Sequence, residues 1–293
     1  MIPPGYTVIG ADSYGTSAWN ATGRITTEAA DGTERRFFVK CHEGERGRIM
    51  MEGEYLGDLE MHNTVPHFGA KPIAWGQCKK SHPPTWFILL DFYDMSMHLP
   101  EPTKFCSRLA EMHAISKSPT GMFGFQVPAV QGYIAQKVDW NSNWAEFYSA
   151  LLADFIDQDS RLSGYWPELE EAFEKLRSIV IPRLLGALEA DGRKVKPCLI
   201  HGNMWEGNSG TELETGAVRI YDSGSFYAHN ELELGMWRNE RIRFRSKSYM
   251  RQYLRNIGVS EPVNEFEDRN RLYSIKYLLC HSCHHPGSYV REK

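Results

Sequence analysis

The first ninety residues alternate short apolar runs with turn residues, which is typical of β-strands. Strands are predicted over residues 7–10, 23–27, 36–40, 73–75 and 86–90. The pair Asp31-Gly32 separates the second run from the third and predicts a tight hairpin turn. Between the third and fourth strands, apolar residues recur at helical spacing over 48–62 and predict one helix.

The pattern changes after Pro100 and Pro102, where longer segments of helical period begin. Helices are predicted over 105–113, 144–156 and 167–188, the last with a kink at Pro182, and again from 232 to the end. Two apolar runs, 197–201 and 217–222, predict a small β insert between the helical regions that end at 188 and begin at 232. We therefore expect a two-lobed α+β fold, with a β-rich lobe at 1–94 and a larger, mainly helical lobe at 95–293.

Composition narrows the function classes. Lys and Arg number 33 and Asp and Glu 37, so the net charge is −4, which argues against a nucleic-acid-binding protein. The longest apolar run is far shorter than the roughly 20 residues of a membrane helix. Six scattered cysteines form no disulfide framework, and the first residues lack the features of a secretory signal. A cytoplasmic, soluble protein without a membrane partner is expected.

The most informative motif runs from His201 to Asn208 and reads HGNMWEGN. Catalytic loops of kinases read H-x-D-x-x-x-x-N, in which the Asp positions the substrate hydroxyl and the Asn holds a metal ion. Asn203 takes the position of that Asp, and Asn208 follows at the kinase spacing. His201 is expected to support the loop.

Three further residues complete a kinase pattern in the expected order. Lys40 ends a predicted strand, where a lysine that contacts phosphates is expected, and Glu54 lies on the following helix, where it could pair with Lys40. Asp222 ends an apolar strand beyond Asn208 and suits a Mg²⁺ ligand. The alternative is that Lys40 and Glu54 are surface charges and that His201 only satisfies a hydrogen bond in the core.

With these motifs the sequence resembles the fructosamine and ketosamine 3-kinases, relatives of the aminoglycoside phosphotransferases and protein kinases, and in particular their fungal members. The resemblance runs from about Ser13 to nearly the last residue. The segments that carry it are 37–40, 52–54, 123–125, 132–136 with Trp140 and Trp144, 201–208, 220–222 and 225–231.

The resemblance implies ATP-dependent phosphorylation of a sugar hydroxyl on a glycated amine. It implies that Lys40 and Glu54 form the ion pair of the nucleotide site and that Asn208 and Asp222 bind Mg²⁺. It also implies that the adenine of ATP binds backbone groups around Asp91, Phe92 and Tyr93. ATP and Mg²⁺ are thus the expected cofactors.

The sequence departs from the family pattern in three places. The family loop reads H-G-D, whereas position 203 is Asn, and an amide cannot accept the proton of a hydroxyl. Because a general base contributes roughly 10²–10⁴ in rate, we expect impaired activity. Family members also have a helix before the glycine-rich loop and usually continue beyond the point where this sequence stops.

Two weaker signals lie near these motifs. The segment 10–16, which includes Gly15, is the candidate loop over the ATP phosphates, although alone it is little better than a hairpin turn. Trp205 lies two residues after Asn203, where its indole could stack on a sugar, although it could also belong to the core.

Two other clusters have simpler explanations. The run 280–285, Cys-His-Ser-Cys-His-His, looks like a metal site, but it lacks a second ligand pair and fits an amphipathic helix better. The basic residues between 238 and 247 favour a solvated face, with a platform for an acidic or phosphate-bearing substrate as the alternative.

Three hypotheses remain open. The first is a ketosamine kinase, whose partners are ATP and a glycated amine or sugar-like small molecule. The second is a non-catalytic, nucleotide-binding pseudokinase of the same fold. The third, a small-molecule kinase of the aminoglycoside or choline type, fits the same ATP site but does not explain the segment 225–231. The exact substrate and the oligomeric state are left open.

Overall fold

A five-stranded antiparallel sheet forms the first lobe in the computed structural model, which describes residues 2–96, 98–288 and 291. Its strands, in the spatial order β1-β2-β3-β5-β4, are β1 (Tyr6–Ser13), β2 (Ala21–Ala29), β3 (Glu34–Glu43), β4 (Pro72–Gln77) and β5 (Thr85–Asp91). All five sequence-predicted strands are present. The predicted turn at Asp31-Gly32 joins β2 to β3, with Gly32 at a positive φ of 83°.

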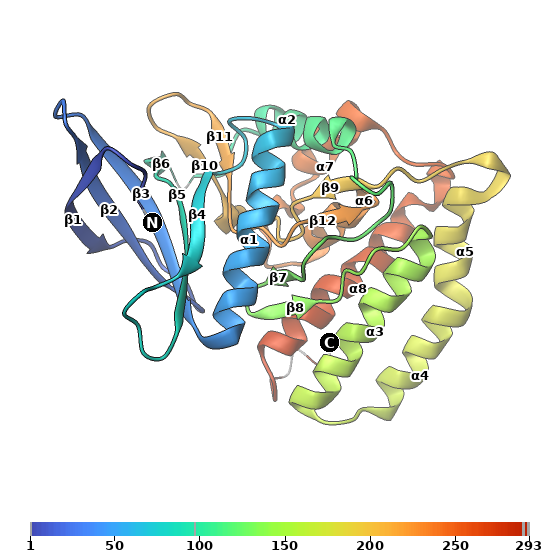
Figure 1. Cartoon of the computed structure of the whole chain (residues 1–293). Coiled ribbons are helices and arrows are strands. Elements are labelled where there is room, and N and C mark those ends of the chain that lie inside the picture. The colour runs from blue at the N-terminus through green and yellow to red at the C-terminus, as the bar shows by residue number, and fades with distance from the viewer. Residues whose placement is uncertain (1, 97, 289–290, 292–293) are drawn as a thin grey trace.

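Alternation along the strands gives this sheet two apolar faces. Phe37 and Leu89 belong to a cluster on one face, while Ile88 and Leu90 belong to a cluster that includes Met50 of helix α1 (Gly44–Thr64). This helix, which the sequence predicts over 48–62, packs on β3, β4 and β5. It lies between the sheet and the second lobe (Figure 1), so it can carry side chains into the space where the lobes meet.

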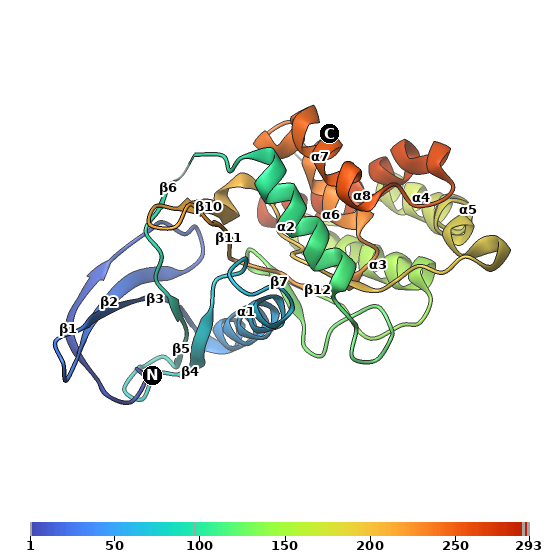
Figure 2. The same ribbon diagram turned by 90° about the horizontal axis from the view of Figure 1, so that it is seen from above.

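The second lobe is mainly helical and contains several very short strands (Figure 2). Its helices are α2 (Pro102–Ile115), α3 (Trp144–Ser163), α4 (Pro167–Lys175), α5 (Ile181–Gly186), α6 (Glu231–Gly235), α7 (Lys247–Ile257) and α8 (Phe266–His284). Its strands are β6 (Met95–Ser96), β7 (Ala129–Gln131), β8 (Ile134–Gln136), β9 (Cys198–Ile200), β10 (Ser209–Glu212), β11 (Val218–Ile220) and β12 (Phe226–Ala228). A single large core of buried apolar side chains, centred on α2, α3, α8 and the β9–β12 pair, holds these elements together.

The short strands place the motif-bearing loops. Strand β9 leads directly into His201 and pairs with β12, while β11 leads to Asp222 and pairs with β10. The predicted strands at 197–201 and 217–222 are therefore confirmed as β9 and β11. Strand β6 follows the end of β5 and pairs with β10 of the second lobe. The division at residue 94 remains a prediction.

The predicted helical regions are present, with interruptions. Residues 167–188 are helical, but a π-helical segment, Leu176–Val180, separates α4 from α5. Pro182 lies at the start of α5, and since proline has no N–H to bond the carbonyl four residues earlier, regular α-helical bonding is interrupted there. Within the described residues, the helices predicted from Leu232 onward are α6, α7 and α8. Within the described ranges, no helix is long and apolar enough to cross a membrane.

Candidate active site

A buried lysine joins both lobes at the centre of the molecule. Lys40, on β3, places its Nζ 2.7 and 2.8 Å from the carboxylate oxygens of Glu54 on α1, and 2.5 Å from Oδ1 of Asp222. The side chains of Lys40 and Glu54 are 7% and 9% exposed, whereas that of Asp222 is 40% exposed. The alternative that Lys40 and Glu54 are surface charges is therefore wrong.

Electrostatics keep Lys40 and Asp222 of this cluster charged. Burial disfavours the ammonium of Lys40, but Asp222 and Glu54 together raise its pKa above the ordinary value. Burial also raises the pKa of Glu54, to about 7, although Lys40 opposes this shift. Burial tends to raise the pKa of Asp222, but the charge and hydrogen bond of Lys40, together with His201 and Asn208, lower it below its ordinary value. Asp222 is thus a carboxylate at neutral pH, facing the partly open side of the cluster.

The motif loop brings two amides against Asp222. Nδ2 of Asn203 donates to the backbone carbonyl of Asp222 at 3.1 Å and to its Oδ2 at 3.2 Å. Nδ2 of Asn208 donates to the carbonyl of Asn203 at 2.9 Å and to that of Asp222 at 3.4 Å. Since both amide nitrogens are used in this way, the Oδ1 atoms of Asn203 and Asn208 are the atoms that remain for a substrate or a cation.

A buried carboxylate that the sequence analysis missed holds this loop from behind. Glu233, on α6, is fully buried and accepts hydrogen bonds from the backbone N–H groups of His201 at 2.6 Å and of Gly202 at 3.0 Å. The ring of His201 contacts the carbonyl of Tyr221 through Nε2 at 3.0 Å, so it links the two loops. The geometry agrees with a supporting role for His201.

Gly202 lets these two loops approach each other. A Cβ at this position would lie 2.2 Å from the carbonyl oxygen of Gly224, and the residue has a positive φ of 75°. Both observations require glycine at the centre of the H-G-N motif.

Comparison with known proteins now decides the family. The sequence model described as "Fructosamine kinase" matches residues 11–293, which is nearly the whole chain. The chain belongs to the fructosamine kinase family. The resemblance inferred from the motifs is thereby confirmed, and so is the expected enzyme class, a kinase.

Named relatives of this chain include plant and animal proteins. The rice (Oryza sativa subsp. indica) protein "Protein-ribulosamine 3-kinase, chloroplastic" is 29% identical over 279 residues, covering 94% of this chain and 73% of the rice protein. The Mus musculus protein "Ketosamine-3-kinase" is 27% identical over 308 residues, covering 96% of this chain and 93% of the mouse protein.

Solved structures confirm the predicted fold. A candidate fructosamine-3-kinase from Haemophilus somnus matches with a TM-score of 0.73 and 18% identity, over 98% of this chain and 89% of that one. An ADP-bound aminoglycoside phosphotransferase matches with a TM-score of 0.57 and 12% identity, over 95% and 86% of the two chains. The two-lobed, kinase-like α+β fold is therefore shared by this chain and by more distant phosphotransferases.

The segment 225–231, which carried part of the resemblance, supports the loop structurally. It forms β12 beside β9, then places the buried ring of His229 between Tyr273 and Ser260 at 2.8 and 2.9 Å. Glu231 then forms a fully buried ion pair with Arg269 of α8, at 2.8 Å. These contacts fix the start of α6, and with it Glu233.

The candidate loop 10–16 spans the end of β1 and the start of the β1–β2 turn, and Asn20 at the end of that turn reaches the site. Gly15 has a positive φ of 77°, and Oγ of Ser17 accepts hydrogen bonds from the N–H groups of Trp19 at 3.3 Å and Asn20 at 3.1 Å. Asn20 then lines a small cavity together with Glu54, Val130, Asn203, Asp222 and other residues. The assignment of Gly15 to ATP binding stays a prediction.

Residues 91–93 connect the lobes, and part of their backbone is already used. The N–H of Asp91 donates to the carbonyl of Lys71 at 2.9 Å, and that of Phe92 donates to the carbonyl of Arg36 at 3.3 Å. The ring of Tyr93 lies under the guanidinium of Arg219, 4.2 Å from the ring centre. Backbone contacts of Asp91 and Phe92 to adenine would therefore be made by their carbonyl groups. The adenine-binding role of residues 91–93 stays a prediction.

The remaining sequence signals have local explanations. Trp205 is 39% exposed, and its ring covers Gly207, where a Cβ would lie 2.2 Å from a ring carbon. Cys280 and Cys283 are buried in α8, as the helix interpretation predicts, and the described residues contain no group of three or more His, Cys, Asp or Glu arranged to hold a metal. In the basic cluster, Arg238 pairs with Glu267 at 2.7 Å. The substrate platform in the basic cluster and the stacking role of Trp205 stay predictions.

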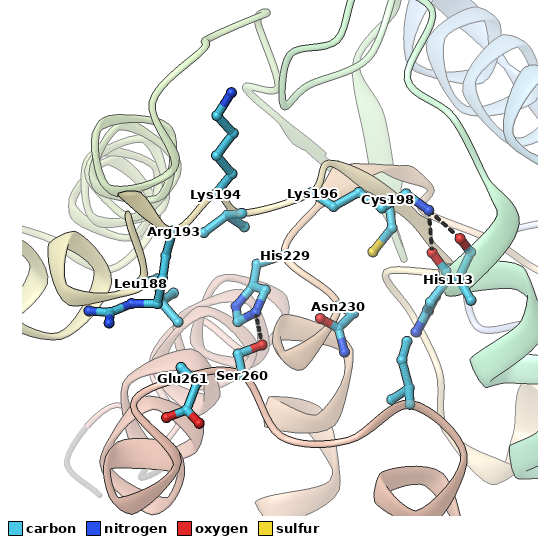
Figure 3. A pocket seen from close by; sticks show the side chains of 13 residues that line it. His113, Leu188, Arg193, Lys194, Lys196, Cys198, His229, Asn230, Ser260 and Glu261 are labelled. Carbon is cyan, nitrogen blue, oxygen red and sulfur yellow. Dashed lines mark hydrogen bonds between the residues drawn. The ribbon is translucent and has the colours of Figure 1, made fainter. Parts of the chain in front are cut away.

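A second cavity lies away from the candidate site (Figure 3). It measures about 400 Å³ and has His229, Asn230 and Cys198 among its walls. Its basic side chains are turned away or engaged, since Lys194 points outward and Lys196 bonds the carbonyl of His113 at 3.3 Å. None of the predicted site residues lines this cavity within the described ranges.

Proposed function

We propose that this chain transfers the terminal phosphoryl group of ATP to a sugar hydroxyl of a glycated amine. The observation that carries the proposal is the position of Lys40, held between Glu54 and Asp222 at 2.5–2.8 Å beside the Asn203–Asn208 loop. Phosphoryl transfer depends mainly on positioning and charge stabilisation, and this cluster supplies a fixed cation, a carboxylate and two amides.

Each residue has a distinct role in this proposal. Lys40 binds the phosphates of ATP, and Glu54 fixes the direction of its side chain. Asp222 and Asn208 are the ligands of Mg²⁺, which neutralises phosphate charge when bound. The fit rests on donor chemistry, because hydrogen bonding uses the nitrogen of the Asn208 amide and leaves its oxygen beside the ionised Asp222.

Asn203 orients the acceptor. Its Oδ1 accepts a hydrogen bond from the sugar hydroxyl, whose oxygen attacks the terminal phosphorus as the bond to the bridging oxygen of ADP breaks. The products are the sugar phosphate, ADP and one proton, which passes to solvent because an amide does not accept it. A carboxylate at this position would assist the proton's departure, so we propose that Asn203 slows the reaction by roughly 10²–10⁴.

The substrate class follows from the family and its named relatives. Ribulosamine and ketosamine appear in the names of the rice and mouse proteins, and both compounds are sugars linked to an amine. We propose a glycated amine of this kind, with Trp205 as a stacking surface because its half-exposed ring lies two residues after Asn203. A cytoplasmic location is part of this proposal.

Mass spectrometry of phosphate transfer tests the proposal. The purified chain is incubated with Mg·ATP and a ribulosamine or fructosamine, and the phosphorylated sugar is measured against an Asp222→Ala control. We expect slow product formation that the control lacks. Thermal denaturation with Mg·ATP is measured in parallel, because a ligand that binds the folded state raises the melting temperature. Stabilisation without transfer would favour the pseudokinase, and absence of both would contradict the kinase proposal.

A further inference from the structure

A second acidic residue of α1 lies beside the candidate site with half of its carboxylate unsatisfied. Asp58 is fully buried, one helical turn after Glu54. Its Oδ1 accepts a hydrogen bond from Oγ of Ser223 at 2.7 Å, while its Oδ2 has no hydrogen-bond partner in the described structure. Burying such a group is costly, so its place in the fold needs an explanation.

The hydrogen-bond partner of Asp58 is the residue that follows Asp222. Asp222 has a φ of 60°, in the left-handed region that non-glycine residues rarely adopt. A conformation of this kind is strained and persists only where neighbouring contacts hold it. Asn203 and Asn208 hold its carbonyl from the second lobe, and the Asp58–Ser223 bond holds the next residue from α1.

A glycine makes this contact between helix and loop possible. A Cβ on Gly57 would lie 2.9 Å from Oγ of Ser223 and 3.0 Å from Cβ of Ser225. Helix α1 therefore packs on the Asp222 loop with no room for a side chain at position 57. Gly57 and Asp58 are thus residues of α1 that contact the loop after Asp222.

We propose that Asp58 is a positioning residue for phosphoryl transfer, which acts through Ser223 to hold the Asp222 carboxylate in its cation-binding orientation. This inference rests on the proposed function. Because Glu54 and Asp58 are on successive turns of one helix, the position of α1 sets both the direction of Lys40 and the orientation of Asp222.

The experiment compares variants of this contact with a matched contact on the same helix. Ser223→Ala and Asp58→Leu remove the hydrogen bond, whereas Asp58→Asn keeps an acceptor oxygen at the same place. The matched control is Tyr227→Phe, because the hydroxyl of Tyr227 donates to Oε1 of Glu60 on α1 at 2.6 Å and neither residue bonds Asp222. Ser223→Ala deletes a single oxygen atom, so it tests the proposal even if Asp58→Leu does not fold.

The readout is the ratio of ATP affinity with Mg²⁺ to ATP affinity in EDTA, together with the Mg²⁺ concentration for half-maximal binding. Substitution of a residue that orients a metal ligand typically weakens metal binding by roughly 10–100-fold. We expect a rise of about tenfold or more in the required Mg²⁺ for Ser223→Ala and Asp58→Leu, and less than about threefold for Asp58→Asn and Tyr227→Phe.

The outcomes separate this inference from the proposed function. Binding is measured without a sugar substrate, so a chain that transfers no phosphate still tests Asp58. Unchanged Mg²⁺ dependence in Ser223→Ala would overturn the inference. An equal shift in Tyr227→Phe would also overturn it, because the effect would then reflect general loosening of α1.

Discussion

The side-chain amide of Asn203 holds Asp222 at two points, its backbone carbonyl and its carboxylate, at 3.1 and 3.2 Å. An aspartate at position 203 would have no hydrogen to donate and would place a second negative charge at this distance. The amide therefore stabilises the cluster without a cation. We therefore expect Asn at position 203 to favour stability without a metal ion, and Asp to favour the rate of phosphoryl transfer.

The first prediction concerns that stability. In EDTA, the free energy of unfolding of Asn203→Asp should be about 1–3 kcal/mol below that of the parent chain, because two hydrogen bonds are lost and like charges meet. The variant should therefore unfold at a lower urea concentration. Mg²⁺ with ATP should narrow the difference, because a cation offsets the added charge. Equal urea midpoints in EDTA would show that the two hydrogen bonds contribute nothing.

The second prediction concerns the buried ion pair. Lys40→Met should lower the free energy of unfolding by about 3–5 kcal/mol, because Glu54 would lose its buried partner. Adding Glu54→Gln should restore part of that loss, while ATP binding stays weak in both variants. Guanidinium unfolding measures the first effect and ATP titration the second.

A surface pair provides the control for this prediction. Arg36 and Asp94 are 2.7 Å apart, with side chains 42% and 47% exposed. Arg36→Gln should therefore cost less than about 1 kcal/mol. If Lys40→Met cost no more than this control, Lys40 would be contributing as an ordinary surface charge.

The third prediction concerns Glu233 and pH. Burial raises the pKa of its carboxyl, but the nearby rings of His113, at 3.6 Å, and His201, with the backbone N–H of His201, outweigh burial and lower it below its ordinary value of 4.5. A lowered folded-state pKa contributes stability above the unfolded value, and this contribution is lost as the pH falls through the folded value. Glu233→Gln should remove this contribution.

Urea unfolding at a series of pH values measures the effect of Glu233. At pH 7 the variant should be less stable by about 1–3 kcal/mol, because Gln offers one acceptor where Glu offers two. Below pH 4.5 the difference between the two proteins should shrink. A difference that is constant over this pH range would mean that the charge of Glu233 does not stabilise the loop.

The sequence predicted the parts of the site that local patterns specify. Lys40 follows an apolar run within β3, Asn203 and Asn208 belong to one short motif, and Asp222 follows the apolar strand β11. Apolar residues at helical spacing over 48–62 predicted the helix that carries Glu54, and the order of the elements placed this helix directly after the strand of Lys40.

The supporting contacts were not predictable because their partners are distant in sequence. Ser223 donates a hydrogen bond to Asp58, which is 165 positions away in the sequence. Lys276 of α8 donates to the carbonyl of Gly202, 74 positions away, and burial lowers the pKa of this lysine to about 8. Strands of two to four residues, such as β6 and β12, are too short to show a period of two. Only the folded chain brings these groups together.

The rate of phosphoryl transfer in Asn203→Asp tests the central claim most directly. Phosphorylation of a ribulosamine is measured by mass spectrometry for the parent chain and the variant, at saturating Mg·ATP and with ATP affinity measured alongside. We predict that the turnover number rises by about 10²–10⁴ in the variant while ATP affinity changes only a few-fold. A variant that binds Mg·ATP but phosphorylates no ketosamine, or a parent chain that already turns over as fast as the variant, would contradict the assignment of Asn203 to the catalytic position.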